Sequence, residues 1–93
     1  MLSIYQWVNG SLREVVTPDG PCWINLADPS TEEILRVQTL TGVSREFLSD
    51  PLDRDERPRM DVDDDGTVLL VVHIPYHEAD ENLHPFNTLP LGV

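Results

Sequence analysis

The densest group of potential metal ligands in the sequence is the acidic run 61–66, Asp-Val-Asp-Asp-Asp-Gly. Carboxylates at alternate positions before a glycine match the first six positions of a calcium-binding loop. The match fails further on, because the ninth and twelfth positions hold a leucine and a valine, which offer no side-chain oxygen. The flanking residues also favour strands, whereas that loop lies between helices. We interpret the run as a solvated hairpin turn, and a calcium-binding module built on Asp61, Asp63 and Asp65 is the alternative.

A second group, His73, His77, Glu78 and His84, contains side chains that bind transition metals. The first two are spaced to share one face of a helix. The valine-rich sequence before them and Pro75 between them oppose a helix, however. We therefore expect a strand with locally satisfied histidines, and a metal site is the less favoured interpretation.

No arrangement typical of a catalytic site is present in the sequence. Ser44 and Ser49 have no histidine near them in the chain, and the glycines occur singly, so no phosphate-binding loop is predicted. Cys22 lies in an apolar run, where a thiol is usually part of the packing. The prediction is that the protein is not an enzyme.

The stretch 50–59 is highly charged and contains two prolines. Its central charged residues are Arg54, Arg57 and Arg59, interleaved with Asp53, Asp55 and Glu56. We expect local ion pairs, each worth about 0–1 kcal/mol at the surface, that hold the shape of an ordered connection.

The elements that must position these side chains begin with strands. Residues 2–8 and 12–16 predict a hairpin around Asn9-Gly10, which tolerates positive φ. The apolar run 22–26 predicts an inner strand of a sheet. A helix follows, capped either by Asp28 or by Ser30 with a glutamate three residues on.

That helix has a narrow apolar stripe at Ile34, Val37 and Leu40, and Gly42 is the predicted stop. Ser44 is the predicted cap of a second, shorter helix that carries Phe47 and Leu48 and ends near Asp50-Pro51.

The second half of the chain predicts more strands. Met60 and Val62 alternate with aspartates, which indicates a half-buried strand. Residues 67–74 predict a more buried strand that Pro75 ends or places at an edge. Residues 77–83 predict a polar loop and 86–93 a further strand, whose abrupt end suggests a piece of a longer protein. The predicted fold class is α/β (α+β), a mixed β-sheet flanked by helices, in one domain over 1–93.

Composition limits the partners. Six arginines, no lysine and 17 acidic residues among 93 give a net charge of −11, which opposes nucleic acid and anionic membranes and attracts cations. The single cysteine excludes an internal disulfide and suggests an intracellular protein. No signal peptide is evident, and the longest apolar run, 68–72, is far shorter than the ~20 residues of a membrane span. We expect a soluble chain.

Several of these residues, in order and spacing, resemble the CorA-type magnesium transporter family. They are Trp23-Ile24-Asn25-Leu26, Asp28-Pro29 with Glu32-Glu33, Thr41-Gly42-Val43, Phe47-Leu48-Ser49-Asp50, Asp53, Glu56-Arg57-Pro58-Arg59 and Phe86-Asn87-Thr88. The resemblance covers nearly the whole chain, but only the N-terminal part of such a transporter's cytoplasmic domain.

The resemblance implies a truncated α/β/α domain of a homopentameric funnel on the cytoplasmic side of the cell membrane. The stalk and the two membrane helices with their Gly-Met-Asn signature are not in this sequence, so the chain itself would neither conduct ions nor contact the membrane. In the family, divalent cations held between neighbouring funnel domains keep the pore closed. The matching ligand position here is Asp50, whereas Ser49 stands where relatives often have a second acidic residue.

Three functions are compatible with these residues. The leading one is the regulatory, Mg²⁺-sensing portion of a divalent-cation transporter, with Co²⁺, Ni²⁺ or Zn²⁺ as the ion carried by related transporters. The alternatives are the freestanding acidic calcium-binding module and a protein-interaction module without metal. An exposed apolar sheet surface that promotes self-association is expected if the chain lacks its last elements.

Overall fold

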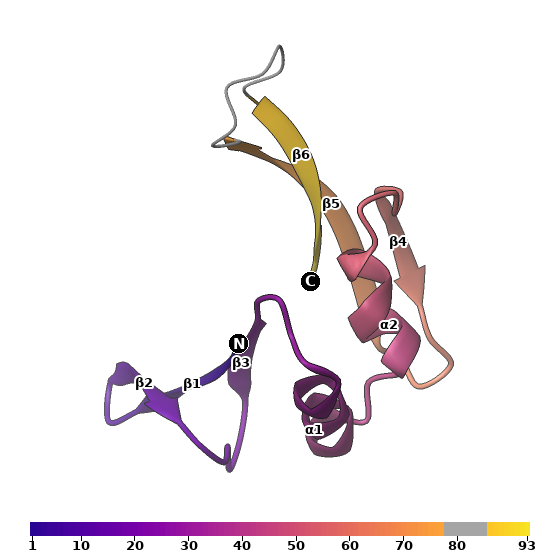
Figure 1. Ribbon diagram of the computed structural model, residues 1–93. Coiled ribbons are helices and arrows are strands. Elements are labelled where there is room, and N and C mark those ends of the chain that lie inside the picture. Colours follow the sequence, from indigo (N-terminus) through magenta and orange to yellow (C-terminus); the bar gives the residue numbers. More distant parts are fainter. Residues whose placement is uncertain (78–85) are drawn as a thin grey trace. The chain divides into compact units, whose positions relative to one another are not determined.

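The computed structural model describes residues 1–77 and 86–93 and divides the chain into two compact units, residues 1–37 and 38–93. In Figure 1, the first unit runs from indigo to purple and the second from magenta to yellow. The expectation of a single domain over 1–93 stays a prediction.

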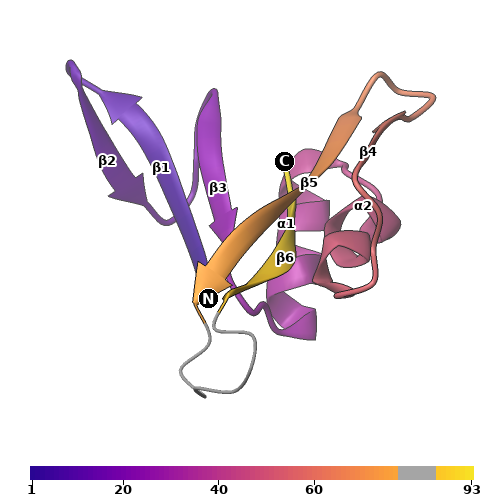
Figure 2. The same ribbon diagram turned by 90° about the horizontal axis from the view of Figure 1, so that it is seen from above.

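The first unit contains a three-stranded antiparallel sheet in the order β2-β1-β3. Its strands are β1 (Leu2–Val8), β2 (Ser11–Val15) and β3 (Cys22–Leu26). Asn9 and Gly10 both have positive φ, 48° and 83°, which confirms the predicted tight hairpin. Figure 2 shows β1 between its two neighbours. The apolar run 22–26 is therefore an edge strand of this sheet rather than the inner strand predicted from its hydrophobicity.

Helix α1 (Thr31–Thr41) begins with the second of the two caps considered. Ser30 Oγ accepts a hydrogen bond from the Glu33 amide at 3.1 Å, and the Ser30 amide donates to Glu33 Oε1 at 2.9 Å. These two bonds form a capping box. Gly42, at φ 76°, ends the helix as predicted. Ile34 and Val37 are buried, but Leu40 is exposed, so the apolar stripe is shorter than expected.

The second unit contains helix α2 (Arg45–Ser49), the short 3-10 helix η1 (Asp50–Leu52) and a sheet in the order β4-β5-β6. The strands are β4 (Arg59–Val62), β5 (Val68–His77) and β6 (Phe86–Gly92). β4 pairs with β5 only as far as Val71, so the Pro75 end of β5 has a neighbour on one side alone among the described residues. Pro75 therefore occupies an edge segment, the second of the two predicted outcomes.

The predicted α+β class is confirmed, because helices are combined with β-structure in both units. Every pairing among the described strands is antiparallel, so the strands form two antiparallel sheets where the sequence predicted one mixed sheet. The short connections explain this result, because a parallel pair needs a crossover of a dozen or more residues.

The two faces of the β4-β5-β6 sheet differ sharply. On one face Leu69 and Val71 are buried, and η1 contacts β6 close to Gly92. On the other face Met60 and Val62 remain 64% and 62% exposed. The alternation predicted for β4 is present with its faces reversed, since the side chains that are partly buried are those of Arg59 and Asp61.

Candidate functional site

Asp50, the predicted metal ligand, lies where α2 passes into η1. Ser44 Oγ accepts a hydrogen bond from the Phe47 amide at 3.3 Å, which confirms the predicted cap of α2. The Asp50 amide donates to the Glu46 carbonyl and ends the helix, and Pro51 follows within η1. Because the backbone on both sides is regular, the Asp50 carboxylate has a defined position with a side chain that is 38% exposed.

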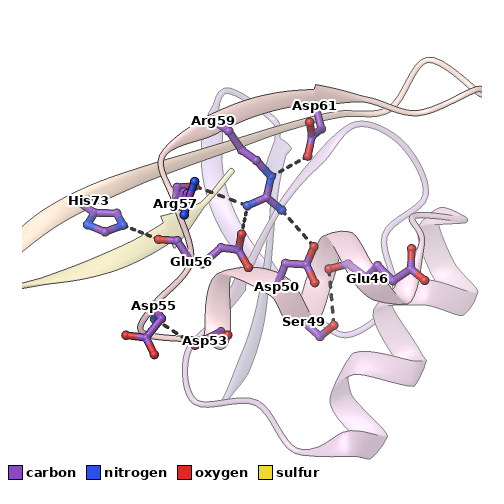
Figure 3. Close-up of polar contacts among 10 residues, drawn as sticks. All are labelled: Glu46, Ser49, Asp50, Asp53, Asp55, Glu56, Arg57, Arg59, Asp61 and His73. Carbon is purple, nitrogen blue, oxygen red and sulfur yellow. Dashed lines mark hydrogen bonds and ion pairs between the residues drawn. The ribbon is translucent and has the colours of Figure 1, made fainter.

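The guanidinium of Arg59 contacts three carboxylates, of which Asp50 supplies one (Figure 3). Arg59 Nη2 donates to Asp50 Oδ2 at 3.0 Å, and Arg59 Nε donates to Asp61 Oδ2 at 2.6 Å. Arg59 Nη1 forms an ion pair with Glu56 Oε1. We call Asp50, Glu56, Arg59 and Asp61 the Arg59 cluster. It joins η1, the following connection and β4, and its formal charge is 1 − 3 = −2.

The electrostatics of the Arg59 cluster follow from this geometry. The pKa of Arg59 is raised, first by its hydrogen bond to Asp61 and then by the charge of Glu56. All four side chains are 22–47% exposed, so water screens their attraction. We expect the cluster to fix the geometry of its carboxylates more than to stabilise the fold.

The connection that carries Glu56 is itself ordered, as predicted. The Glu56 amide donates to the Asp53 carbonyl at 3.1 Å, and the Asp55 amide donates to Asp53 Oδ1 at 3.0 Å. His73 Nε2 donates to the Glu56 carbonyl oxygen at 2.7 Å, which ties the connection to β5. Of the ion pairs predicted within this stretch, Arg59–Glu56 forms. Arg54 and Arg57 form no ion pair with any residue in 1–77 or 86–93.

The acidic run forms a hairpin turn, as interpreted. The Gly66 amide donates to the Asp63 carbonyl at 3.0 Å, and Gly66 has φ 89°. Asp65 Oδ1 accepts from the Thr67 amide at 2.9 Å, and this bond lowers the pKa of Asp65. Asp63 Oδ1 accepts from the next amide in the turn, while Asp61 is bound to Arg59. The three aspartates of the calcium alternative therefore have separate partners.

The other candidate residues are not brought into one site. Among the described residues, no group of three or more His, Cys, Asp or Glu side chains is placed to hold a metal ion. Glu78 and His84 of the proposed histidine site lie outside the described residues. Cys22 is exposed, not packed as expected, because its strand lies at the sheet edge. Ser49 donates a long hydrogen bond of 3.5 Å to the Glu46 carbonyl, and Ser44 serves as a helix cap.

Sequence reasoning missed the contacts of Arg59 with Asp50 and Asp61. The second contact had only a partial signal, because Arg59 was assigned to the connection and Asp61 to the strand, although residues two apart on a strand share one face. The first joins residues nine apart through a turn and had no local signal.

Comparisons with known proteins leave the function open. No protein-family model, no curated protein and no solved structure matches this chain at the significance required. None of the helices in residues 1–77 and 86–93 has the length and hydrophobicity needed to cross a membrane.

Proposed function

We propose that this chain is part of the cytoplasmic regulatory domain of a CorA-type transporter of Mg²⁺ or a related divalent cation. In this proposal Asp50 contributes one carboxylate to a regulatory ion, and an adjacent subunit of the homopentamer supplies the other ligands. The observation that carries the proposal is the position of Asp50. It is held at the junction of α2 and η1, partly exposed, within a cluster of formal charge −2.

The chemistry of Mg²⁺ is compatible with such a divided site. Mg²⁺ keeps several of its waters and is typically held by one or two carboxylates. An ion that bridges two acidic surfaces stabilises only the arrangement in which both surfaces meet. The net charge of −11 supplies the repulsion that would separate the subunits when the ion is lost.

The local structure of the residues that carry the resemblance also supports the proposal. The Trp23–Leu26 segment lies in β3, and Gly42 ends α1. The segment 47–50 covers the last turn of α2 and the start of η1. These elements are in the order that the resemblance implies.

Arg59 has a defined part in this function. It donates to Asp50 Oδ2 and so partly neutralises that carboxylate when no ion is bound. A divalent cation at Asp50 must compete with this guanidinium. Removing the arginine leaves three carboxylates without their counter-charge and should attract the cation more strongly.

Magnesium titration of the 93-residue chain tests these statements. We expect weak binding, at millimolar concentrations or above, because the partner ligands are missing. The nuclear magnetic resonance shifts of the backbone amides in α2 and η1 should move with Mg²⁺, Asp50→Asn should abolish this response and Arg59→Gln should strengthen it. Asp64→Asn is the matched control, since it removes the same charge from an exposed turn. A site of micromolar affinity, or an equal response in Asp50→Asn, would contradict the divided site.

The family assignment has its own test in the coding sequence that follows the codon of Val93. The proposal expects a long polar helix and two apolar spans of ~20 residues, the first ending near Gly-Met-Asn. A stop codon at that point would remove the transporter and favour the calcium-binding module or the interaction module.

A further inference from the structure

The turn of the β1–β2 hairpin consists of an asparagine and a glycine that are both exposed. Asn9 has φ 48°, in the left-handed region that asparagine tolerates better than most residues with a side chain. The pairing of β1 with β2 ends at Val8 and Ser11, so the Gly10 N–H takes no part in the ladder. A Cβ atom at Gly10 would meet nothing within 4 Å. The space around the Asn9–Gly10 peptide bond is therefore open to a reaction between the two residues.

We propose that Asn9 is a site of spontaneous covalent modification, in which its side chain deamidates through a cyclic imide. The Gly10 amide nitrogen attacks Asn9 Cγ and loses its proton, the side-chain amide nitrogen leaves as ammonia, and a succinimide ring forms. A water molecule then opens the ring. Cleavage of the bond between the nitrogen and Cγ gives aspartate, whereas cleavage of the original peptide bond leaves the main chain running through Cγ, as isoaspartate. The proposal uses neither Asp50 nor the transporter assignment.

The position of the turn in the sheet favours this reaction in the folded chain. Ring closure requires rotation about the Cα–C bond of Asn9, and the paired strands on either side of the turn resist that rotation. However, β2 lies at the edge of its sheet. Its first four residues are exposed, and Leu12 is 57% exposed. Opening of this end of the hairpin therefore loses little apolar burial, and local opening is easiest where such burial is small.

Two other residues show why Asn9 is selected. Asn25 lies inside β3, opposite Ser3, and a leucine follows it, so both strand pairing and a bulky neighbour oppose ring closure. Asp65 is followed by a glycine, but there the ring would have to expel water from a carboxyl group. The hydrogen bond of 2.9 Å from the Thr67 amide lowers the pKa of Asp65 and keeps it ionised, and an ionised carboxylate resists attack. Asn9 combines a reactive amide with an open glycine neighbour.

The two products should affect the hairpin differently. An aspartate before glycine favours the same turn as Asn-Gly, so Asn9→Asp should keep the hairpin and change the net charge from −11 to −11 − 1 = −12. Isoaspartate adds a methylene group to the main chain within the turn. Val8 and Ser11 then no longer fit opposite one another, and β2 should separate from β1. The pairing of β1 with β3 does not depend on this turn and should persist.

Peptide mapping by mass spectrometry tests the proposal on the full 93-residue chain, kept folded at physiological temperature and mildly alkaline pH. Cleavage after Arg13 releases a peptide in which Asn9 is the sole asparagine. This peptide should convert into two products of equal mass and different chromatographic retention, while the peptide that carries Asn25 stays unchanged. Asn9→Asp supplies the standard for the aspartate product. Amide hydrogen exchange in the aged sample should show a loss of protection in β2 and not in β3.

Gly10→Ala tests the part played by the glycine. A methyl group beside the attacking nitrogen should slow the conversion of Asn9 severalfold. The comparison with the unsubstituted chain is made in urea, because Gly10 has φ 83° and an alanine there would strain the folded turn.

Three results would overturn the inference. The first is a folded chain in which Asn9 stays intact over a period that converts it in urea, because the hairpin would then protect it. The second is equal conversion of Asn25 and Asn9. The third is formation of aspartate without isoaspartate, which would indicate direct hydrolysis of the side-chain amide and no ring.

Discussion

Substitution of Gly92 by alanine tests the packing that places Asp50. Gly92 lies in β6 opposite Val71, and η1 contacts β6. A Cβ atom at this position would lie 2.8 Å from Pro51 Cβ and in still closer conflict with Pro51 Cγ. Because the proline ring cannot rotate away, either β6 or η1 must shift. Overpacking of this kind costs about 1–3 kcal/mol.

The opposing effect of alanine is smaller. Replacing glycine restricts the unfolded chain and stabilises a protein by about 0.4–1 kcal/mol where the native backbone permits it. The expected net loss is therefore about 1–2 kcal/mol. At about 4–8 °C per kcal/mol for a domain of this size, the midpoint of thermal unfolding should fall by roughly 4–16 °C.

Urea unfolding followed by far-ultraviolet circular dichroism measures this loss, and amide hydrogen exchange in β5 and β6 locates it. Gly20→Ala is the control, because a Cβ there would meet only Gln6 Nε2, at an ordinary distance of 3.5 Å. Gly92→Ala should also disturb the Asp50–Arg59 contact, since η1 begins at Asp50. Equal stability of the two alanine variants would refute the close approach of η1 to β6.

Two further predictions concern the start of α1 and the acidic turn. The pKa of Glu33 is held below its ordinary value of 4.5, mainly by the Ser30 amide and also by the N-terminal ammonium. Because the pKa of Glu33 is depressed, its ionised carboxylate stabilises the fold above pH 4.5, and this contribution is lost as the pH falls through the folded-state pKa. Glu33→Gln should therefore remove this part of the pH dependence of the free energy of unfolding, measured by urea titrations at a series of pH values. Asp63→Asn and Asp65→Asn keep the side-chain oxygens that accept hydrogen bonds in the acidic turn, so both variants should fold normally. Their calcium and magnesium binding, measured by calorimetry, should be unchanged. A loss of calcium binding would instead support the calcium-binding module.

The parts of the fold that sequence reasoning predicts well are those set by local chemistry. The Asn9-Gly10 turn, the Ser30 capping box, the stop at Gly42 and the Ser44 cap each depend on residues within four positions of one another. Their hydrogen bonds form in any context that allows a helix or a hairpin. The residue types alone therefore place these elements closely.

The predictions that fail depend on what lies next to an element in space. A period of two fixes the alternation of β4 but not which of its faces is covered, and here the covered side carries Arg59 instead of Met60. Likewise, the apolar character of β3 does not reveal that β1 occupies the centre of the sheet. The guanidinium of Arg59 forms ion pairs with Asp50 at a helix end and with Asp61 in a strand, and no short sequence pattern predicts this combination.

The reversed faces of β4 also predict which substitutions affect the magnesium response. Asp50 is bound to Arg59, on the face of the sheet that contains Leu69 and Val71, whereas Val72 belongs to the opposite face. Val72→Thr should therefore leave the magnesium response of the chain unchanged, whereas Asp50→Asn should abolish it. If Val72→Thr weakened the response as much as Asp50→Asn does, the placement of the Asp50 carboxylate on the covered face of the sheet would be wrong.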